Sequence, residues 1–252
     1  MKGARFTRVE QRRPDLRSPF PPRFAARLKG QTVLRVGRRA KYLLAVLSSG
    51  DTLLMHLGMS GSFRIDDPDA IDRHDHVVFH MSSGKVVTFN DPRRFGFMDL
   101  LTPRQLTDHP ALSTLGPEPL SPAFDAAALA MKCRGKKTSL KAALLDQRVV
   151  AGLGNIYVSE ALHVARLSPY RRASTIATAT GAPKPAAVRL AAAIKQVLEE
   201  AVARKAKARY QSGRFRVYDR AGERCRHARC IGSIAQRTQA GRSSYYCPVC
   251  QR

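Results

Sequence analysis

Four cysteines near the end of the sequence constrain the fold of this 252-residue chain more than any other feature. They form two close pairs, Cys225 with Cys230 and Cys247 with Cys250, and the sixteen residues between the pairs suit a short hairpin. Four thiolates in two close pairs are the ligand set of a tetrahedral Zn²⁺ site. The residues around them are too few to form a hydrophobic core, so metal binding would supply their folding free energy. The sequence therefore predicts a zinc-finger β-hairpin that holds one structural zinc ion.

Two other interpretations of these cysteines stay open at this point. Disulfide pairing needs an oxidising compartment, and it is disfavoured because no secretory signal is visible in the sequence. His227 lies inside the first spacer and could compete as a ligand, although four thiolates already complete the coordination shell. The fifth cysteine, Cys133, stands apart and is expected to be a buried thiol in a helix.

Charge is the second constraint. The formal charge is +25, from 44 Lys and Arg against 19 Asp and Glu. Residues 1–41 carry 13 basic and two acidic residues, as do residues 204–252, whereas residues 42–203 are nearly balanced. So large a charge opposes compaction unless a polyanion is bound. Two basic ends around a balanced centre predict two walls of a cleft that binds nucleic acid, with charge for solubility alone as the other interpretation.

The hydrophobic pattern divides the chain into a β-rich first half and a helical second half. Apolar segments flank the turns at 48–51 and 82–85, which predicts two hairpins within a sandwich of two sheets. Further strands are expected at 32–36 and 95–100, helices at 123–133, 139–146, 156–165 and 185–208, and a short strand at 215–218. No apolar run exceeds about six residues, so neither a membrane-spanning helix nor a membrane partner is expected.

Seven short motifs occur along the chain in a characteristic order. They are Gly37-Arg38-Arg39-Ala40-Lys41-Tyr42-Leu43-Leu44, His56-Leu57-Gly58-Met59-Ser60-Gly61, His74-Asp75-His76, Asp91-Pro92-Arg93-Arg94-Phe95-Gly96, Leu115-Gly116-Pro117-Glu118-Pro119-Leu120, Gly152-Leu153-Gly154-Asn155-Ile156-Tyr157, and the terminal cysteine hairpin. In this order they closely resemble the formamidopyrimidine-DNA glycosylases, which are bifunctional base-excision repair enzymes for oxidised purines. The resemblance covers nearly the whole chain, from Gly3 to Arg252.

The resemblance implies an α+β protein with three parts. These are an N-terminal β-sandwich over residues 1–115, a helix-two-turns-helix domain over 121–214, and a C-terminal zinc finger over 215–252. DNA would be held between two lobes, and a monomer suffices to do this. The expected partner is double-stranded damaged DNA in the bacterial cytoplasm, at the nucleoid.

A glycosylase turns its target nucleotide out of the helix and must fill the gap left in the base stack. The resemblance implies that Met59, Arg93 and Phe95 fill this gap, with Arg93 facing the orphaned cytosine. Side chains of these types on turns suit a wedge. The alternative, without the resemblance, is that Met59 and Phe95 are core residues.

Asn155 is the residue that the resemblance assigns to a phosphate. It follows Gly152-Leu153-Gly154 and opens a helix, where free N–H groups and the helix dipole favour an anion. The glycines alone would also fit a tight turn between two helices. By resemblance, Lys41 and Arg242 bind phosphate with Asn155 and also donate protons in β- and δ-elimination, respectively.

Three further residues receive roles from the resemblance alone. His74 and Lys136 fall on positions that contact DNA, although each would otherwise be an ordinary surface residue. Lys141 falls on a lysine near the lesion pocket.

The sequence departs from the family at two places. The family's nucleophile is a proline directly after the initiator methionine, followed by a catalytic glutamate, and an α-amine suits this role because its pKa of about 8 leaves free base at neutral pH. This chain begins Met1-Lys2-Gly3 and aligns after the family's first helix, so we expect an N-terminally truncated member without that proline and glutamate. Residues 204–214 are short and basic where many members carry a longer loop over the everted base, which favours formamidopyrimidines over 8-oxoguanine.

Two functions are therefore weighed. The first is a DNA glycosylase and AP lyase that removes formamidopyrimidines, with 8-oxoguanine as a further candidate, through a Schiff base and β,δ-elimination. The alternative is a non-catalytic protein that binds damaged or abasic DNA with the same clamp. An endonuclease VIII-like preference for oxidised pyrimidines is disfavoured because the motif at 91–96 is of the purine-repair type. An RNA-binding zinc protein would leave the wedge residues without a use.

For the 252-residue chain we expect no covalent adduct on an abasic duplex in the presence of borohydride. Neither the Met1 α-amine nor the Lys2 side chain stands where the family's proline does in the sequence, and either could replace that proline only if the end of the chain reached the lesion pocket. Denaturing electrophoresis of the treated mixture measures the adduct. A trapped complex would contradict this expectation and restore lyase activity to this chain.

Overall fold

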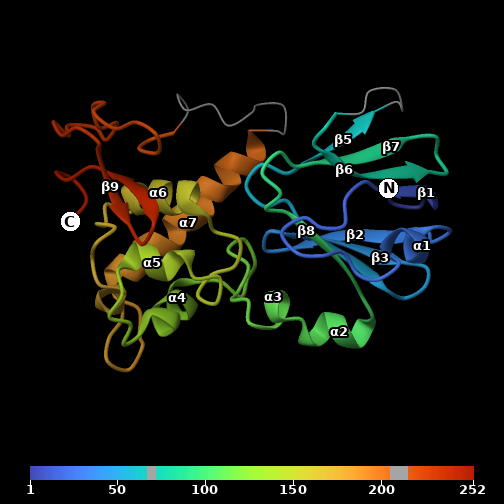
Figure 1. Ribbon diagram of the computed structural model, residues 1–252. Coiled ribbons are helices and arrows are strands. Elements are labelled where there is room, and N and C mark those ends of the chain that lie inside the picture. The colour runs from blue at the N-terminus through green and yellow to red at the C-terminus, as the bar shows by residue number, and fades with distance from the viewer. Residues whose placement is uncertain (67–71, 205–214) are drawn as a thin grey trace. The chain divides into compact units, whose positions relative to one another are not determined.

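A computed structural model describes residues 1–66, 72–204 and 215–252 (Figure 1). The contacts within the chain divide it into two units, Met1–Ser113 and Thr114–Arg252. The division into three domains stays a prediction. Residues 205–214, which include most of the short basic segment, lie outside the described residues.

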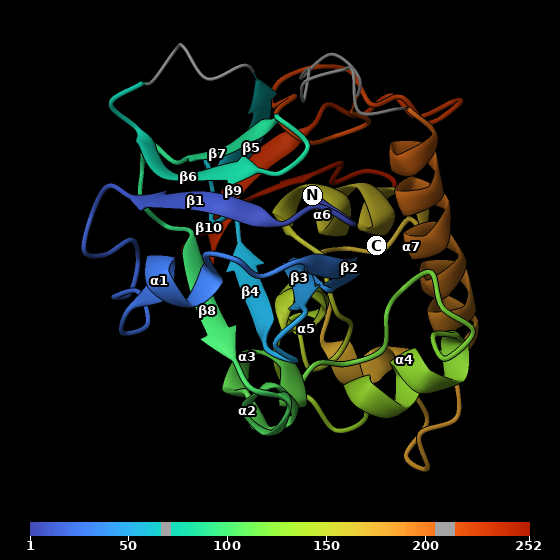
Figure 2. The ribbon, with the colours of Figure 1, turned by 90° about the vertical axis from the view of Figure 1, so that its right-hand side faces the viewer.

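The first unit is the predicted sandwich of two antiparallel four-stranded sheets, which lie one over the other in Figures 1 and 2. One sheet has the order β1-β6-β7-β5, and its strands are β1 (Phe6–Gln11), β5 (Ser62–Asp66), β6 (Asp75–Met81) and β7 (Val86–Asn90). The other has the order β2-β3-β4-β8, with β2 (Val33–Arg39), β3 (Tyr42–Leu47), β4 (Thr52–His56) and β8 (Phe97–Leu101). Three short helices accompany them: α1 (Phe24–Leu28), α2 (Pro103–Asp108) and α3 (Pro110–Ser113).

Large apolar side chains from both sheets fill the space between them. Phe6 and Phe79 come from the first sheet, with ring centroids 5.4 Å apart, and Leu53 and Met55 come from the second. Full burial of each such side chain contributes about 1.5–3 kcal/mol, so this shared core accounts for the stacking of the sheets. The predicted hairpins, β3–β4 and β6–β7, are both confirmed.

In the second unit the helices come first, and a two-stranded hairpin follows near its end. Its helices are α4 (Ala126–Cys133), α5 (Leu140–Leu145), α6 (Asn155–Val164), the short 3₁₀ helix η1 (Ala173–Ile176) and α7 (Pro185–Ala203). The Asp125 and Ser139 side chains cap α4 and α5 by accepting N–H bonds. Helix α7 is described over Pro185–Ala203, and residues 205–208 of the helix predicted to residue 208 lie outside the described residues. Among the described residues, no helix is both long enough and apolar enough to cross a membrane.

The prediction of a short strand at 215–218 is wrong. The backbone N–H groups of Arg216, Val217 and Tyr218 all donate to the Glu160 carboxylate of α6, at 2.8, 2.9 and 3.1 Å. Three successive donors that converge on one carboxylate require a curved loop, whereas a strand points successive N–H groups in opposite directions. Glu160 is buried, so these bonds replace the water that its charge has lost.

The predicted β-hairpin between the two cysteine pairs is confirmed. Strands β9 (Ala235–Gln239) and β10 (Arg242–Tyr246) pair antiparallel and are joined by Ala240 and Gly241. Both turn residues have positive φ, 49° and 70°, which is the type I′ geometry that matches the twist of a hairpin. This hairpin, the helices and the two sheets together confirm the α+β class.

Asp75, the first residue of β6, is a buried carboxylate with three hydrogen-bond donors. It accepts from Arg64 Nη2 at 3.0 Å, Asn90 Nδ2 at 2.8 Å and the Asp72 backbone N–H at 2.7 Å. Burial by itself would raise the pKa of Asp75, but the bonds from Asn90 and Asp72 and the charge of Arg64 outweigh it and lower the pKa.

We expect Asp75→Asn to lower the free energy of unfolding at pH 7 by about 2–4 kcal/mol, because the amide cannot accept from all three donors. Asp108→Asn, at an exposed position, should change it by less than about 0.5 kcal/mol. Urea unfolding measures both.

The stabilisation by Asp75 is complete above the unfolded carboxyl pKa of about 4 and is lost as the pH falls through the lower folded pKa. The variant and the wild type should therefore converge below pH 4, and equal stabilities at pH 7 would contradict the expectation.

Candidate nucleic-acid interface and metal centre

Two surface loops of the first unit, residues 57–61 and 91–96, are joined by one buried carboxylate. Asp91 accepts a hydrogen bond from Ser60 Oγ at 2.6 Å and one from the Gly96 backbone N–H at 2.8 Å. Ser60 Oγ in turn accepts from the Arg93 backbone N–H at 3.2 Å. These bonds fix each loop against the other.

The loops also approach each other closely at Gly58. This residue has a φ of +66°, and a Cβ at this position would overlap the backbone of Phe95 and Gly96. Only glycine satisfies both conditions. The turn that carries Met59 therefore depends on Gly58 for its shape and for its contact with the second loop.

The predicted wedge residues project from these loops into solvent. Met59 is 70% exposed and Phe95 is 42% exposed, so the interpretation of both as core residues is wrong. The guanidinium of Arg93 lies over the Phe95 ring, 4.8 Å from its centroid, in a cation–π contact. Exposed apolar side chains on rigid loops are suited to insertion into another molecule.

Lys41 lies in the exposed turn between β2 and β3, beside an aromatic cluster. Tyr42, the next residue, pairs across the sheet with His56, and the His56 ring stacks on Phe97 at 5.7 Å. Burial, together with the charges of Lys41 and Arg17, lowers the pKa of His56.

His56 is a candidate that the sequence analysis left without a role. Its Nδ1 accepts the Gly58 N–H at 3.0 Å, so in the neutral ring Nε2 carries the proton and can donate to a ligand. Two features of the sequence could have indicated a role for His56: it begins the motif at 56–61, and it lies in the strand that pairs with the one after Lys41.

His74 is tied to the loop at 91–96 through its backbone. Its carbonyl accepts the Asp91 N–H at 3.0 Å, and its partly exposed ring accepts from Arg73 Nε at 3.0 Å. The structure thus brings the predicted DNA contact His74 beside the loop that carries Arg93 and Phe95.

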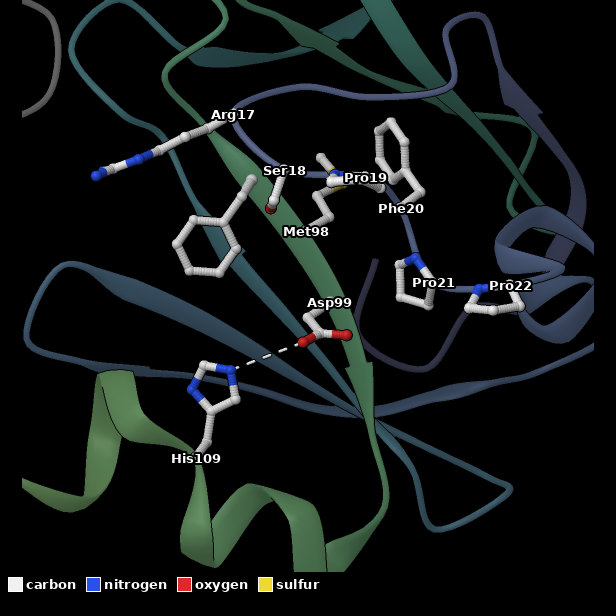
Figure 3. A pocket seen from close by; sticks show the side chains of 10 residues that line it. Arg17, Ser18, Pro19, Phe20, Pro21, Pro22, Met98, Asp99 and His109 are labelled. Carbon is white, nitrogen blue, oxygen red and sulfur yellow. Dashed lines mark ion pairs between the residues drawn. The ribbon is translucent and has the colours of Figure 1, made fainter.

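A pocket of about 580 Å³ opens elsewhere on the first unit (Figure 3). Its lining includes the segment 17–22 and residues of β8, and none of the site residues predicted from the sequence is among its lining residues. His109 Nε2 and Asp99 Oδ2 face each other in it at 3.7 Å, and the Arg17 side chain extends away from the prolines. Phe97 connects the pocket to the aromatic cluster because it lines the one and stacks in the other.

In the second unit, two predicted residues meet at the hairpin carbonyl of Ser243, and a third directly precedes Ser243 in the chain. Asn155, at the first turn of α6, donates from Nδ2 to this oxygen at 2.9 Å, and Lys141 Nζ donates to it at 2.7 Å. Lys141 also donates to Ser244 Oγ at 2.7 Å. Arg242, the residue before Ser243, is exposed at the end of the type I′ turn.

Lys141 is 1% exposed, and burial together with the charge of Arg242 lowers its pKa to about 8. Its contacts are with the hairpin, and its predicted place near a lesion pocket stays untested. Lys136, the remaining predicted DNA contact, lies partly exposed in the turn that follows α4.

The four cysteines of the C-terminal pattern converge on one point. Their sulfur atoms all lie within 4.8 Å of one another, with 3.8 Å between Cys225 and Cys250 and 3.6 Å between Cys230 and Cys247. Around a tetrahedral ion with bonds of about 2.3 Å to sulfur, neighbouring sulfur atoms lie about 3.8 Å apart. All four cysteines are free, which excludes the disulfide interpretation in this structure. The cluster can hold one metal ion.

Two histidines lie against this cluster. His163 Nε2 is 3.3 Å from Cys225 Sγ, and the His163 and His227 rings stack with centroids 4.2 Å apart. His227 Nε2 is hydrogen-bonded to the His163 carbonyl at 2.8 Å, so this nitrogen is not directed at the metal position. Burial, and after it the charges of His227 and nearby arginines, lower the pKa of His163 to about 3.

A β-sandwich with exposed wedge loops, a helical second unit and a four-cysteine hairpin together define a class of DNA-repair proteins. The profile for the formamidopyrimidine-DNA glycosylase N-terminal domain matches residues 1–98, and that for the H2TH domain of the same enzymes matches residues 115–212. The chain belongs to the formamidopyrimidine-DNA glycosylase family.

Individual relatives agree with this assignment. Proteins named formamidopyrimidine-DNA glycosylase from Bradyrhizobium diazoefficiens and Nitrobacter winogradskyi are 54% and 55% identical to the chain, covering 100% of it and 94% of their own length. The Lactococcus lactis enzyme non-covalently bound to DNA with an AP site has a TM-score of 0.88 at 29% identity, with 100% of this chain and 94% of that one covered. The same enzyme in a complex with FAPY-dG DNA has a TM-score of 0.87 at 29% identity, with 99% and 93% covered.

The close approach at Gly58 generates a prediction. Gly58→Ala should destabilise the protein by at least about 2 kcal/mol more than Gly84→Ala, because both glycines have positive φ but only Gly58 meets backbone atoms where a Cβ would lie. Gly84→Ala should cost about 1–2 kcal/mol from its φ alone. Urea unfolding of the two variants measures the difference, and equal losses would show that the loop contact is not tight.

Proposed function

We propose that this protein acts in base-excision repair: it binds damaged duplex DNA, and the activity of its family is the removal of oxidised purine bases followed by AP lyase cleavage. Its relatives are named formamidopyrimidine-DNA glycosylase, and its structural neighbours hold DNA with abasic or FAPY-dG sites. The single observation that carries the proposal is the pair of exposed wedge loops held by Asp91. Exposed apolar side chains on rigid loops are suited to insertion into a base stack from which a nucleotide has been displaced.

The first unit supplies the residues that would enter the base stack. Met59 and Phe95 offer apolar surface to the neighbouring bases, and Arg93 offers a fork of N–H donors to the base left without its partner. Lys41, His56 and His74 would bind the phosphates on either side of the displaced nucleotide. Neutral His56 would do so as a hydrogen-bond donor, whereas Lys41 would do so as a charge.

The second unit supplies a phosphate site at the beginning of α6. Asn155 and the N-terminal end of α6, with its helix dipole, would face the anion together with Arg242, and Lys136 would add a positive charge from the turn after α4. Lys141 and Asn155 both hold the carbonyl next to Arg242, which limits the directions that the arginine can take. The roles of Lys41 and Arg242 as proton donors in β- and δ-elimination are part of this proposal and come from the family.

The metal we propose for the four-cysteine cluster is Zn²⁺. Four thiolates in a tetrahedron suit zinc, and the observed sulfur separations fit its bond length. A site closed by four protein ligands has no position for a substrate, so the ion would hold the hairpin in place and take no part in the chemistry. The relatives are bacterial proteins and the proposed partner is duplex DNA, so we place the protein in the bacterial cytoplasm, at the nucleoid, where a monomer suffices to bind one duplex.

A second function is recognition of damaged DNA without cleavage. It is favoured because nearly all the roles proposed for the described residues are roles in binding DNA. Apart from proton donation by Lys41 and Arg242, every role proposed above is a binding role, and no described residue is assigned the attacking amine.

We expect Met59→Ala to weaken binding to a duplex with an abasic-site analogue by about tenfold or more, because the wedge no longer fills the gap. Binding to the intact duplex should be unchanged, since it depends on phosphate contacts. Fluorescence anisotropy at two salt concentrations measures both affinities, and both should fall steeply between about 50 and 200 mM salt. Ile65→Ala, which removes a similarly exposed side chain of β5, is the control.

The same duplexes decide between the two functions. Release of a formamidopyrimidine base by the wild-type chain establishes the glycosylase, whereas selective binding without release establishes the second function. Equal affinity of the wild-type chain for intact and abasic duplexes would overturn both.

A further inference from the structure

His163 lies against the four-cysteine cluster although it is outside the cysteine pattern. It is near the C-terminal end of α6 and is 1% exposed, so its ring is held among protein atoms. Its Nε2 is 3.3 Å from Cys225 Sγ, which is a normal distance for an N–H to sulfur hydrogen bond. The sulfur of Cys225 thus has a polar neighbour that comes from a helix and not from the hairpin.

The hydrogen-bond partners of the ring decide which nitrogen carries the proton. A neutral imidazole has one N–H and one lone pair. Nε2 faces the sulfur, whereas Nδ1 is buried and has no partner among the described residues. A proton on Nδ1 would leave a buried donor unsatisfied and place the Nε2 lone pair against a thiolate. The ring is therefore the Nε2–H tautomer and donates to Cys225.

His227 holds the His163 ring in this orientation. The two rings stack at 4.2 Å with 30° between their planes. His227 Nε2 donates to the backbone carbonyl of His163 at 2.8 Å, so the spacer between the first two cysteines is fastened to α6. The donor at Cys225 is thus preorganised.

The negative charge of the zinc-bound site explains why a hydrogen bond to Cys225 would stabilise it. Four thiolates around Zn²⁺ carry a net charge of −2, and Cys225 is buried, so water cannot stabilise that charge well. A hydrogen bond to a thiolate ligand lowers its charge density and holds it in position for the metal.

We propose that His163 is an outer-shell residue of the zinc site, whose Nε2–H bond to Cys225 slows the release of zinc and fastens the hairpin to α6. This proposal rests on zinc as the metal of the cluster, and it does not depend on the glycosylase activity.

Direct ligation by histidine is the competing arrangement. His163, His227 and Cys250 also offer ligand atoms within 4.8 Å of one another. The outer-shell role is favoured because four sulfurs within 4.8 Å of one another already supply a complete ligand set and because His227 Nε2 is bonded to a carbonyl.

The test compares the zinc-loaded full chain with two variants at His163. His163→Phe keeps a ring but removes the donor, whereas His163→Gln removes the ring but can place an N–H near the same point. We expect His163→Phe to release zinc to an excess of a coloured chelator about 10- to 100-fold faster than wild type, and His163→Gln to stay within about threefold. His109→Phe, in the first unit, is the control and should release zinc at the wild-type rate. Release from His163→Phe at the wild-type rate would overturn the proposal.

Two measurements on the unsubstituted residue cover the case in which His163→Phe does not fold. In the zinc-loaded wild-type chain, ¹⁵N chemical shifts of the His163 ring should show a protonated Nε2 and an unprotonated Nδ1. The opposite tautomer would overturn the proposal. With Co²⁺ in place of zinc, the thiolate-to-metal absorption should have the intensity of four sulfur ligands, and fewer than four would show that a histidine is a ligand. Neither measurement involves DNA, so failure here is distinct from failure of the proposed function.

Discussion

The last residues of this chain depend on four thiolates that meet at one point. Besides them, the hairpin of β9 and β10 is supported by a small apolar cluster and by the bonds from Lys141 and Asn155 to Ser243. A metal bound to the thiolates would fix the hairpin, the hairpin would fix Ser243, and Ser243 would fix the place from which Arg242 extends. Helix α6 is a further support, because Asn155 at its beginning and His163 near its end both bond to this C-terminal region. The phosphate site that we propose would thus be built on an element that a metal stabilises.

Helix α6 shows how one element can serve both structure and function. Its first turn presents Asn155, and its middle carries Glu160, whose carboxylate takes the backbone N–H groups of the loop at 216–218. A buried acid inside a strongly basic protein needs compensation, and here the compensation also determines the course of the chain. The helix thereby orders residues that follow it by more than fifty positions.

The sequence was informative wherever the deciding interaction was local or had a fixed spacing. Turn composition predicted both hairpins of the sandwich, and cysteine spacing predicted the metal cluster. The strand expected at 215–218 was wrong because its competitor, Glu160, lies far away in the sequence. The bond from Lys141 to Ser243 was hidden for the same reason, since nothing near residue 141 indicates a contact with the hairpin. Strand β5 was missed although Ser62–Asp66 alternates between polar and apolar residues; Ile65 is exposed, so this alternation does not mark a buried face.

The shared carboxylate of Asp91 has a consequence for the kinetics of recognition. The two wedge loops are already ordered against each other before any partner arrives, through the bonds of Ser60 to Asp91 and Arg93. Binding would then immobilise only side chains, at about 0.5–1.5 kcal/mol each, and would require no folding of the backbone. The slow step at a damaged site would be the departure of the nucleotide from the helix, and the protein would act as a rigid probe that tests how easily each base pair opens.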